Sequence, residues 1–144
     1  MGLLNMASGS SLWRGYEYFS NNNVLSYERI NESEYKASVL GSMKDPYHVY
    51  IDIKHPKKST CDCPFAEDNT KVCKHKVALF FCVFPEEAQA YIDEIEEYEA
   101  EEEQRYQEHY QEVERYVKSL SKKELQIALI NELTERDDEE YDRW

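Results

Sequence analysis

Cys61-Asp62-Cys63, joined by nine residues to Cys73-Lys74-His75, is the stretch of sequence on which we expect the rest of the fold to depend. It presents three thiols and one imidazole in the pattern Cys-x-Cys and Cys-x-His. Structural zinc sites use four nitrogen and sulfur ligands of this kind in a closed tetrahedral shell. We therefore predict that the chain binds Zn²⁺ through Cys61, Cys63, Cys73 and His75.

The two halves of this motif suit different elements of secondary structure. Side chains two residues apart in a strand point to the same face, so Cys61 and Cys63 fit the end of a strand. Cys73 and His75 fit the first turn of a helix, where free backbone N–H groups and the helix dipole favour a thiolate. A disulfide and a redox site are the alternatives, although Cys-x-Cys pairs bond each other poorly and the sequence has no Cys-x-x-Cys motif. Four protein ligands leave no position for a catalytic water, so the predicted zinc is structural.

Three segments upstream of the motif are candidate strands, and in the second and third of them apolar and polar residues alternate with the period of two that is typical of half-buried antiparallel strands. They are residues 24–30, 34–42 and 47–54. From Val72 onward, apolar residues gather as in a buried helix, which Pro85 is expected to end or bend. A short helix capped by Ser10 or Ser11 is expected before the strands. The whole pattern predicts an α+β fold with a small antiparallel sheet.

The C-terminal half of the chain differs in charge from the rest. Residues 1–80 hold 10 Lys/Arg and 9 Asp/Glu, a net charge of +1, whereas residues 81–144 hold 7 and 21, a net charge of −14. High helix propensity follows Pro85, and Ser121 with Glu124 has the form of a capping box that opens another helix. We predict three regions: a flexible N-terminus over residues 1–11, a zinc-finger domain over residues 12–85, and an acidic helical extension over residues 86–144.

Composition excludes a membrane protein. No stretch approaches the roughly 20 apolar residues of a membrane-spanning helix. Residues 1–6 have neither the basic start nor the long apolar run of a secretory signal. We therefore expect a cytoplasmic protein without a membrane partner, in a reducing compartment where clustered cysteines favour metal over disulfide.

The motif and its surroundings resemble the SWIM zinc finger, whose signature is Cys-x-Cys, a variable gap and Cys-x-His. Cys61-Asp62-Cys63-Pro64 and Cys73-Lys74-His75 fit this signature. In the bacterial members, residues 14–19 are similar to the opening helix, residues 37–42 and 47–53 to the sheet, and residues 121–133 to a short helical segment that often follows the finger. The resemblance to the finger itself covers residues 12–84. It implies a short sheet followed by a ββα-like zinc unit that binds DNA or proteins.

Two groups of lysines flank the ligands, and they are Lys54, Lys57 and Lys58, then Lys71, Lys74 and Lys76. Zinc would bring the two groups together into a basic patch able to contact phosphates. We therefore predict a non-catalytic module with a nucleic-acid partner. An enzyme is not expected, because the sequence has no phosphate loop, paired-carboxylate site or nucleophile–base pair.

The acidic helices leave other partners open. The acidic helices have three interpretations. They form a solvated surface, they carry a face for self-association or for a protein partner, or they imitate the phosphate array of DNA as an inhibitor does. The alternative function is therefore a protein-interaction adaptor or an acidic DNA mimic that acts through the C-terminal helices.

Overall fold

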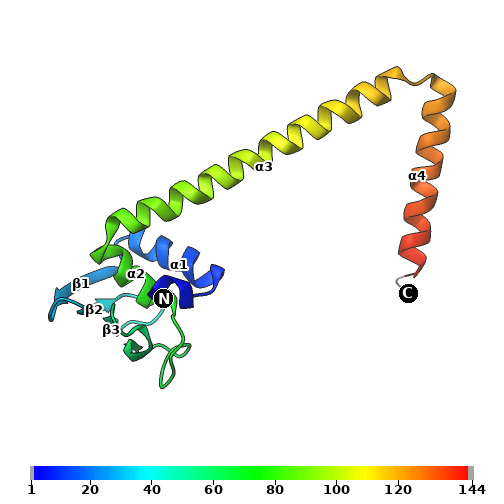
Figure 1. Ribbon diagram of the computed structural model, residues 1–144. Coiled ribbons are helices and arrows are strands. Elements are labelled where there is room, and N and C mark those ends of the chain that lie inside the picture. The colour runs from blue at the N-terminus through cyan, green and yellow to red at the C-terminus, as the bar shows by residue number, and fades with distance from the viewer. Residues whose placement is uncertain (1, 143–144) are drawn as a thin grey trace. The chain divides into compact units, whose positions relative to one another are not determined.

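A computed structural model describes residues 2–142 of the chain (Figure 1). The chain divides into two compact units, Met1–Asp93 and Glu94–Trp144. The first unit combines a four-stranded antiparallel sheet with helices, and the described part of the second unit is helical. The predicted α+β fold, with a small antiparallel sheet and a helical C-terminal region, is therefore confirmed.

The sheet is a meander in which each strand pairs with the next one along the chain. Its antiparallel strands lie in the order β1 (Val24–Arg29), β2 (Glu34–Val39), β3 (Tyr47–Asp52) and β4 (Thr60–Cys61). Alternate residues of the two central strands are buried, namely Tyr35, Ala37, Val39, Val49 and Ile51. This burial with a period of two is the feature that the sequence pattern detected, and the three longer strands lie where it predicted them.

Helix α2 (Lys74–Val83) packs on the sheet, and helix α1 (Gly9–Ser20) packs on α2. Val77 and Phe81 of α2 are fully buried between these two layers. The close approach of the helices requires glycine at position 15, because a Cβ there would lie 2.3 Å from Val77 Cγ1. Close packing at Gly15 therefore fixes the position of α1 relative to α2. At this contact α1 lies next to the first turn of α2.

The N-terminal segment contributes to the core, which differs from the flexible N-terminus expected over residues 1–11. Leu3 lies in the short 3₁₀-helix η1 (Leu3–Met6), is 1% exposed, and belongs to the same hydrophobic cluster as the sheet. Ser8, rather than Ser10 or Ser11, caps α1, because its Oγ accepts a hydrogen bond from the Ser11 N–H at 3.1 Å. The segment before Ser8 is too short to carry a periodic signal, so its burial depends on tertiary contacts.

Helix α3 (Pro85–Ser119) begins directly after α2, because proline ends one helix but suits the first position of the next. Its first turns belong to the first unit. Ala88 is buried, and the Tyr91 ring stacks on Phe81 at a centroid distance of 5.6 Å. The first unit therefore extends to Asp93, beyond the predicted domain boundary at residue 85.

The remainder of α3 and helix α4 (Lys122–Asp142) expose most of their described side chains. The Ser121 N–H donates to Glu124 Oε1 at 3.0 Å, and the Glu124 N–H donates to Ser121 Oγ at 3.2 Å, which confirms the predicted capping box. The predicted acidic extension corresponds to α3 and α4, except that residues 143 and 144 lie outside the described residues. Among the helices in residues 2–142, none has both the length and the apolar character needed to cross a membrane.

Candidate metal centre

The four predicted ligands converge at one place in the first unit. Cys61 ends β4, Cys63 follows two residues later, Cys73 is the N-cap of α2, and His75 lies in the first turn of that helix. One ligand atom from each residue lies within 4.8 Å of those of the other three, and Cys61 Sγ is 3.7 Å from His75 Nδ1. All four side chains are buried, with at most 4% of any of these residues exposed. The cluster is therefore buried, and its four residues come from the two ends of the loop that joins β4 to α2.

The loop between the two ligand pairs is closed by its own hydrogen bonds. The Cys63 carbonyl accepts hydrogen bonds from the backbone N–H groups of Ala66 at 3.2 Å and Glu67 at 2.9 Å. Near the other end of the loop, Asn69 Oδ1 accepts from the Lys71 N–H at 2.8 Å. These turns reverse the chain, so that the helix carrying the second ligand pair begins next to the first pair.

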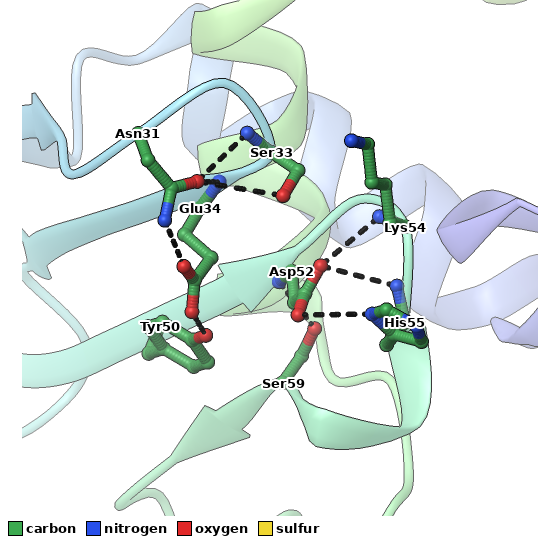
Figure 2. A network of polar contacts seen from close by, with 8 residues as sticks. All are labelled: Asn31, Ser33, Glu34, Tyr50, Asp52, Lys54, His55 and Ser59. Atoms are coloured by element: carbon green, nitrogen blue, oxygen red, sulfur yellow. Dashed lines mark hydrogen bonds and ion pairs between the residues drawn. The ribbon is translucent and has the colours of Figure 1, made fainter.

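A polar network fixes the segment that leads into the first ligand pair (Figure 2). The buried Asp52 carboxylate accepts hydrogen bonds from the backbone N–H groups of Lys54 at 3.0 Å and His55 at 3.1 Å. The Asp52 backbone N–H donates to Ser59 Oγ at 3.0 Å. These bonds hold the turn that contains the 3₁₀-helix η2 (Pro56–Lys58), so β4 returns alongside β3 and delivers its cysteine to the cluster.

The same network ties the β1–β2 turn to β3, as Figure 2 also shows. Asn31 Oδ1 accepts hydrogen bonds from the backbone N–H groups of Ser33 at 2.9 Å and Glu34 at 3.0 Å. The Glu34 carboxylate in turn accepts from the Asn31 amide and from the Tyr50 hydroxyl. The hydrogen bond from Tyr50 lowers the pKa of Glu34, and the same bond raises the pKa of Tyr50 to about 12. This network supports the sheet and holds no ligand of the cluster.

The three thiols of the cluster differ in acidity, because they share protons in a buried site. A hydrogen bond from the Cys61 thiol, assisted by His75, lowers the pKa of Cys73 to about 4. The same hydrogen bond raises the pKa of Cys61, and burial raises the pKa of Cys63. A metal ion would stabilise the thiolate form of all three.

The His75 ring is held between two tyrosines. Ring centroids lie 4.7 Å from Tyr47 and 5.4 Å from Tyr18. Its Nδ1 faces Cys61, whereas its Nε2 is buried and has no hydrogen-bond partner among the described residues. Gly41 leaves the room for this arrangement, since a Cβ there would lie 2.4 Å from Tyr47 Cε2 and 3.3 Å from His75 Nε2. No local sequence pattern connects Tyr18, Tyr47 or Gly41 with the motif, so only the fold identifies them as its neighbours.

The donor set and its spacing suit a tetrahedral metal ion. Zinc bonds of about 2.3 Å to sulfur and about 2.0 Å to nitrogen imply sulfur–sulfur separations of about 3.8 Å and sulfur–nitrogen separations of about 3.6 Å. The distance of 3.7 Å between Cys61 Sγ and His75 Nδ1 agrees with the second value. Three sulfurs and one imidazole, without a carboxylate, favour a soft or borderline ion over Mg²⁺ or Ca²⁺. The residues therefore form a candidate metal centre.

Of the six lysines predicted to form a basic patch, four are exposed, one is half-buried and one is fully buried. The exposed ones are Lys54, Lys57, Lys58 and Lys71. Lys74 is half-buried, with Nζ 4.9 Å from the centre of the Tyr18 ring. Lys76 is fully buried instead, and its Nζ donates a hydrogen bond to the Lys71 carbonyl at 2.7 Å. A buried ammonium needs such a partner, so Lys76 supports the loop and is not available to a phosphate.

Comparisons with protein-family models, with curated proteins and with solved structures found no match for this chain. A function therefore has to be argued from the cluster, its surroundings and the charges of the two units.

Proposed function

We propose that the first unit is a zinc-stabilised, non-catalytic interaction module of the SWIM type. The observation that carries this proposal is the buried convergence of Cys61, Cys63, Cys73 and His75 within 4.8 Å. Zinc bound there would cross-link β4, the loop and α2, so that metal binding contributes directly to folding. Four protein donors fill a tetrahedral shell and leave no position for a reacting water, which favours a structural role.

The partner that the proposal assigns to this module is a nucleic acid. Lys57 and Lys58 are exposed on η2, and Lys54 is exposed on the turn that the Asp52 carboxylate holds. Lys71 adds a further exposed cation beside the second ligand pair. Lysines in such positions contact phosphates, which supplies affinity without reading the base sequence.

Fluorescence anisotropy of labelled single- and double-stranded oligonucleotides, over a salt series, tests this assignment. The test variant is Lys57→Gln/Lys58→Gln, and the matched control is Lys122→Gln/Lys123→Gln at the start of α4. If each lysine of the first pair contacts one phosphate of a single strand, the slope of log K against log salt should fall by about 1.4. The control should leave the slope unchanged. Failure of the zinc-loaded chain to bind any oligonucleotide at low salt would refute the nucleic-acid assignment.

The acidic helices favour a second candidate function, an adaptor for a basic protein. Large apolar side chains are exposed on both helices, among them Tyr106, Tyr110, Val113 and Tyr116 on α3 and Ile127, Leu129, Ile130 and Leu133 on α4. They occur in the part of the chain whose net charge is −14 over residues 81–144. Exposed apolar groups among acidic ones suit a basic amphipathic surface, or a protein that otherwise binds the phosphates of DNA. A chain ending at Asp93 should then lose the protein partner and keep oligonucleotide binding.

A further inference from the structure

A cavity of about 480 Å³ adjoins the metal centre, and three of the four candidate ligands, Cys63, Cys73 and His75, form part of its lining. Its polar lining comes from the starts of two helices and from the loop before β3, and includes Ser8, Ser10, Ser11, Arg14, Ser42 and Lys74. We propose that this α1–α2 cavity is a binding site for a phosphate group. The inference deepens the proposed function and rests on it, because a nucleic-acid strand is the source of phosphate that it favours.

The charges around the α1–α2 cavity favour an anion. Arg14 and Lys74 line it, no carboxylate does, and neither cation forms an ion pair within the described residues. Zinc with three thiolates would carry a net charge of −1, and the two cations outweigh it. Arginine suits this role, since its planar guanidinium matches two phosphate oxygens at once. Hydroxyl groups of the serines add donors that adjust to the ligand.

Both helices begin at the cavity, which adds backbone donors to those side chains. α1 starts at Gly9 and has 12 residues, and α2 starts at Lys74 and has 10. The first N–H groups of a helix have no partner inside it, and together with the helix dipole they attract anions. Two such ends meet here, because Gly15 allows α1 to lie close against α2.

His75 adds a buried polar atom without a hydrogen-bond partner to the surroundings of the α1–α2 cavity. It lines the cavity, is 3% exposed, and its Nε2 has no hydrogen-bond partner within the described residues. When Nδ1 holds the metal, Nε2 carries the proton and becomes a donor. The other ring N–H of a metal-bound histidine almost always donates a hydrogen bond to a carboxylate, a carbonyl or water. An anion in the cavity, alone or through a water, would supply the missing acceptor.

Aromatic rings at the rim favour a nucleotide as the bearer of the phosphate. Tyr47 and Phe65 line the same cavity, and Phe65 is 52% exposed. Nucleic-acid bases stack on such rings whatever their sequence. The volume of the cavity also lies within the range of sites that hold small organic ligands. A free phosphorylated small molecule would offer the same phosphate group to the cavity. The test therefore distinguishes a nucleic-acid strand from such a molecule as the source of the phosphate.

The first arm of the test is an NMR titration of the zinc-loaded, full-length chain with inorganic phosphate at constant ionic strength. The amide resonances of Ser10 and Lys74 should shift and saturate. Arg14→Gln should weaken this binding roughly tenfold, as expected for a hydrogen bond to a charged group. Arg29→Gln removes the same charge at an exposed position on β1 outside the cavity, and it should change nothing. Absence of these shifts, or equal behaviour of the two variants, would overturn the proposal.

The second arm measures the binding of a labelled twelve-nucleotide oligothymidylate to the same variants by fluorescence anisotropy. If a strand phosphate occupies the cavity, Arg14→Gln should weaken binding and lower the salt slope by about 0.7, the value for one phosphate contact on a single strand. Phosphate binding without any oligothymidylate binding would support the phosphate site and indicate a small phosphorylated molecule as its ligand. That result would contradict the nucleic-acid function but not the cavity proposal. Oligothymidylate binding that depends on Lys57 and Lys58 but not on Arg14, without phosphate-induced shifts, would refute the phosphate site in the cavity. The proposed nucleic-acid function would then remain supported.

Discussion

Replacing His75 with alanine should remove a large part of the stability of the first unit. Structural zinc contributes about 10–16 kcal/mol in zinc-finger peptides at neutral pH, so an equal share for one of four ligands is about 2.5–4 kcal/mol. The ring also fills the space between Tyr18 and Tyr47, and a buried group of this size leaves a cavity that costs about 1–2 kcal/mol more. The sum, about 4–6 kcal/mol, approaches the whole stability of a marginal domain, which is about 5–15 kcal/mol.

Urea unfolding followed by the fluorescence of Trp13 measures this loss. Trp13 lies on α1 and stacks on Tyr16 at 6.2 Å, so it reports on the first unit rather than on the long helices that dominate circular dichroism. A Trp144→Phe background leaves it as the only tryptophan, because the chain has two. His109→Ala, at an exposed position on α3, is the matched control.

A second variant separates the metal from the packing of the ring. His75→Cys retains four nitrogen or sulfur donors, so it should bind zinc and unfold at a urea concentration between those of the wild type and His75→Ala. His109→Ala should match the wild type. The reasoning fails if His75→Ala retains one zinc per chain and unfolds at the same urea midpoint as His109→Ala.

Three further predictions follow from single contacts or from charge. Tyr50 should titrate near pH 12, and Glu34→Gln should bring its pKa down towards 10, as followed by NMR. The stabilisation from this pair is therefore full between pH 4.5 and pH 10, and it is lost as the pH rises towards 12 or falls through the lowered pKa of Glu34. Gly15→Ala places a methyl group against Val77 of α2 and should lower the free energy of unfolding by about 1–3 kcal/mol, as measured in urea. Gly9→Ala, whose methyl group meets no other atom, should not destabilise the chain, and equal urea midpoints for the two variants would contradict the helix contact. A chain ending at Asp93 changes the net charge from −13 to −2, with 10 Lys/Arg and 12 Asp/Glu, and should bind oligonucleotides more tightly at low salt; unchanged or weaker binding would contradict the repulsion argument.

The parts of the fold that could be predicted are those in which local pattern and tertiary burial agree. Alternating residues mark β2 and β3 because one face of the sheet is covered by α2. Ser121 and Glu124 mark a helix start because the capping bonds are made between residues three apart. The ligand cluster could be predicted from the spacing of its donors along the chain. The strand expected to carry both Cys61 and Cys63 ends at Cys61, and Cys63 lies in the bend that follows it.

The remaining features depend on contacts between segments far apart in the sequence. Leu3 has no periodic neighbours, and it is buried only because it joins the hydrophobic cluster of the first unit. Lys76 looks like a surface residue in the sequence, yet the helix directs it towards the Lys71 carbonyl. Arg14 meets Lys74 at the cavity through the packing of α1 on α2, which no local pattern indicates.

The most direct test of the metal centre is the metal content of the chain purified without added metal. Native mass spectrometry, supported by elemental analysis, should find one zinc ion per chain, and the Cys63→Ser and His75→Ala variants should hold zinc more weakly and retain less than one ion per chain. Substitution by Co²⁺ should give the visible absorption of a tetrahedral thiolate site. A folded, reduced chain that contains no metal and takes up neither zinc nor cobalt would contradict the account.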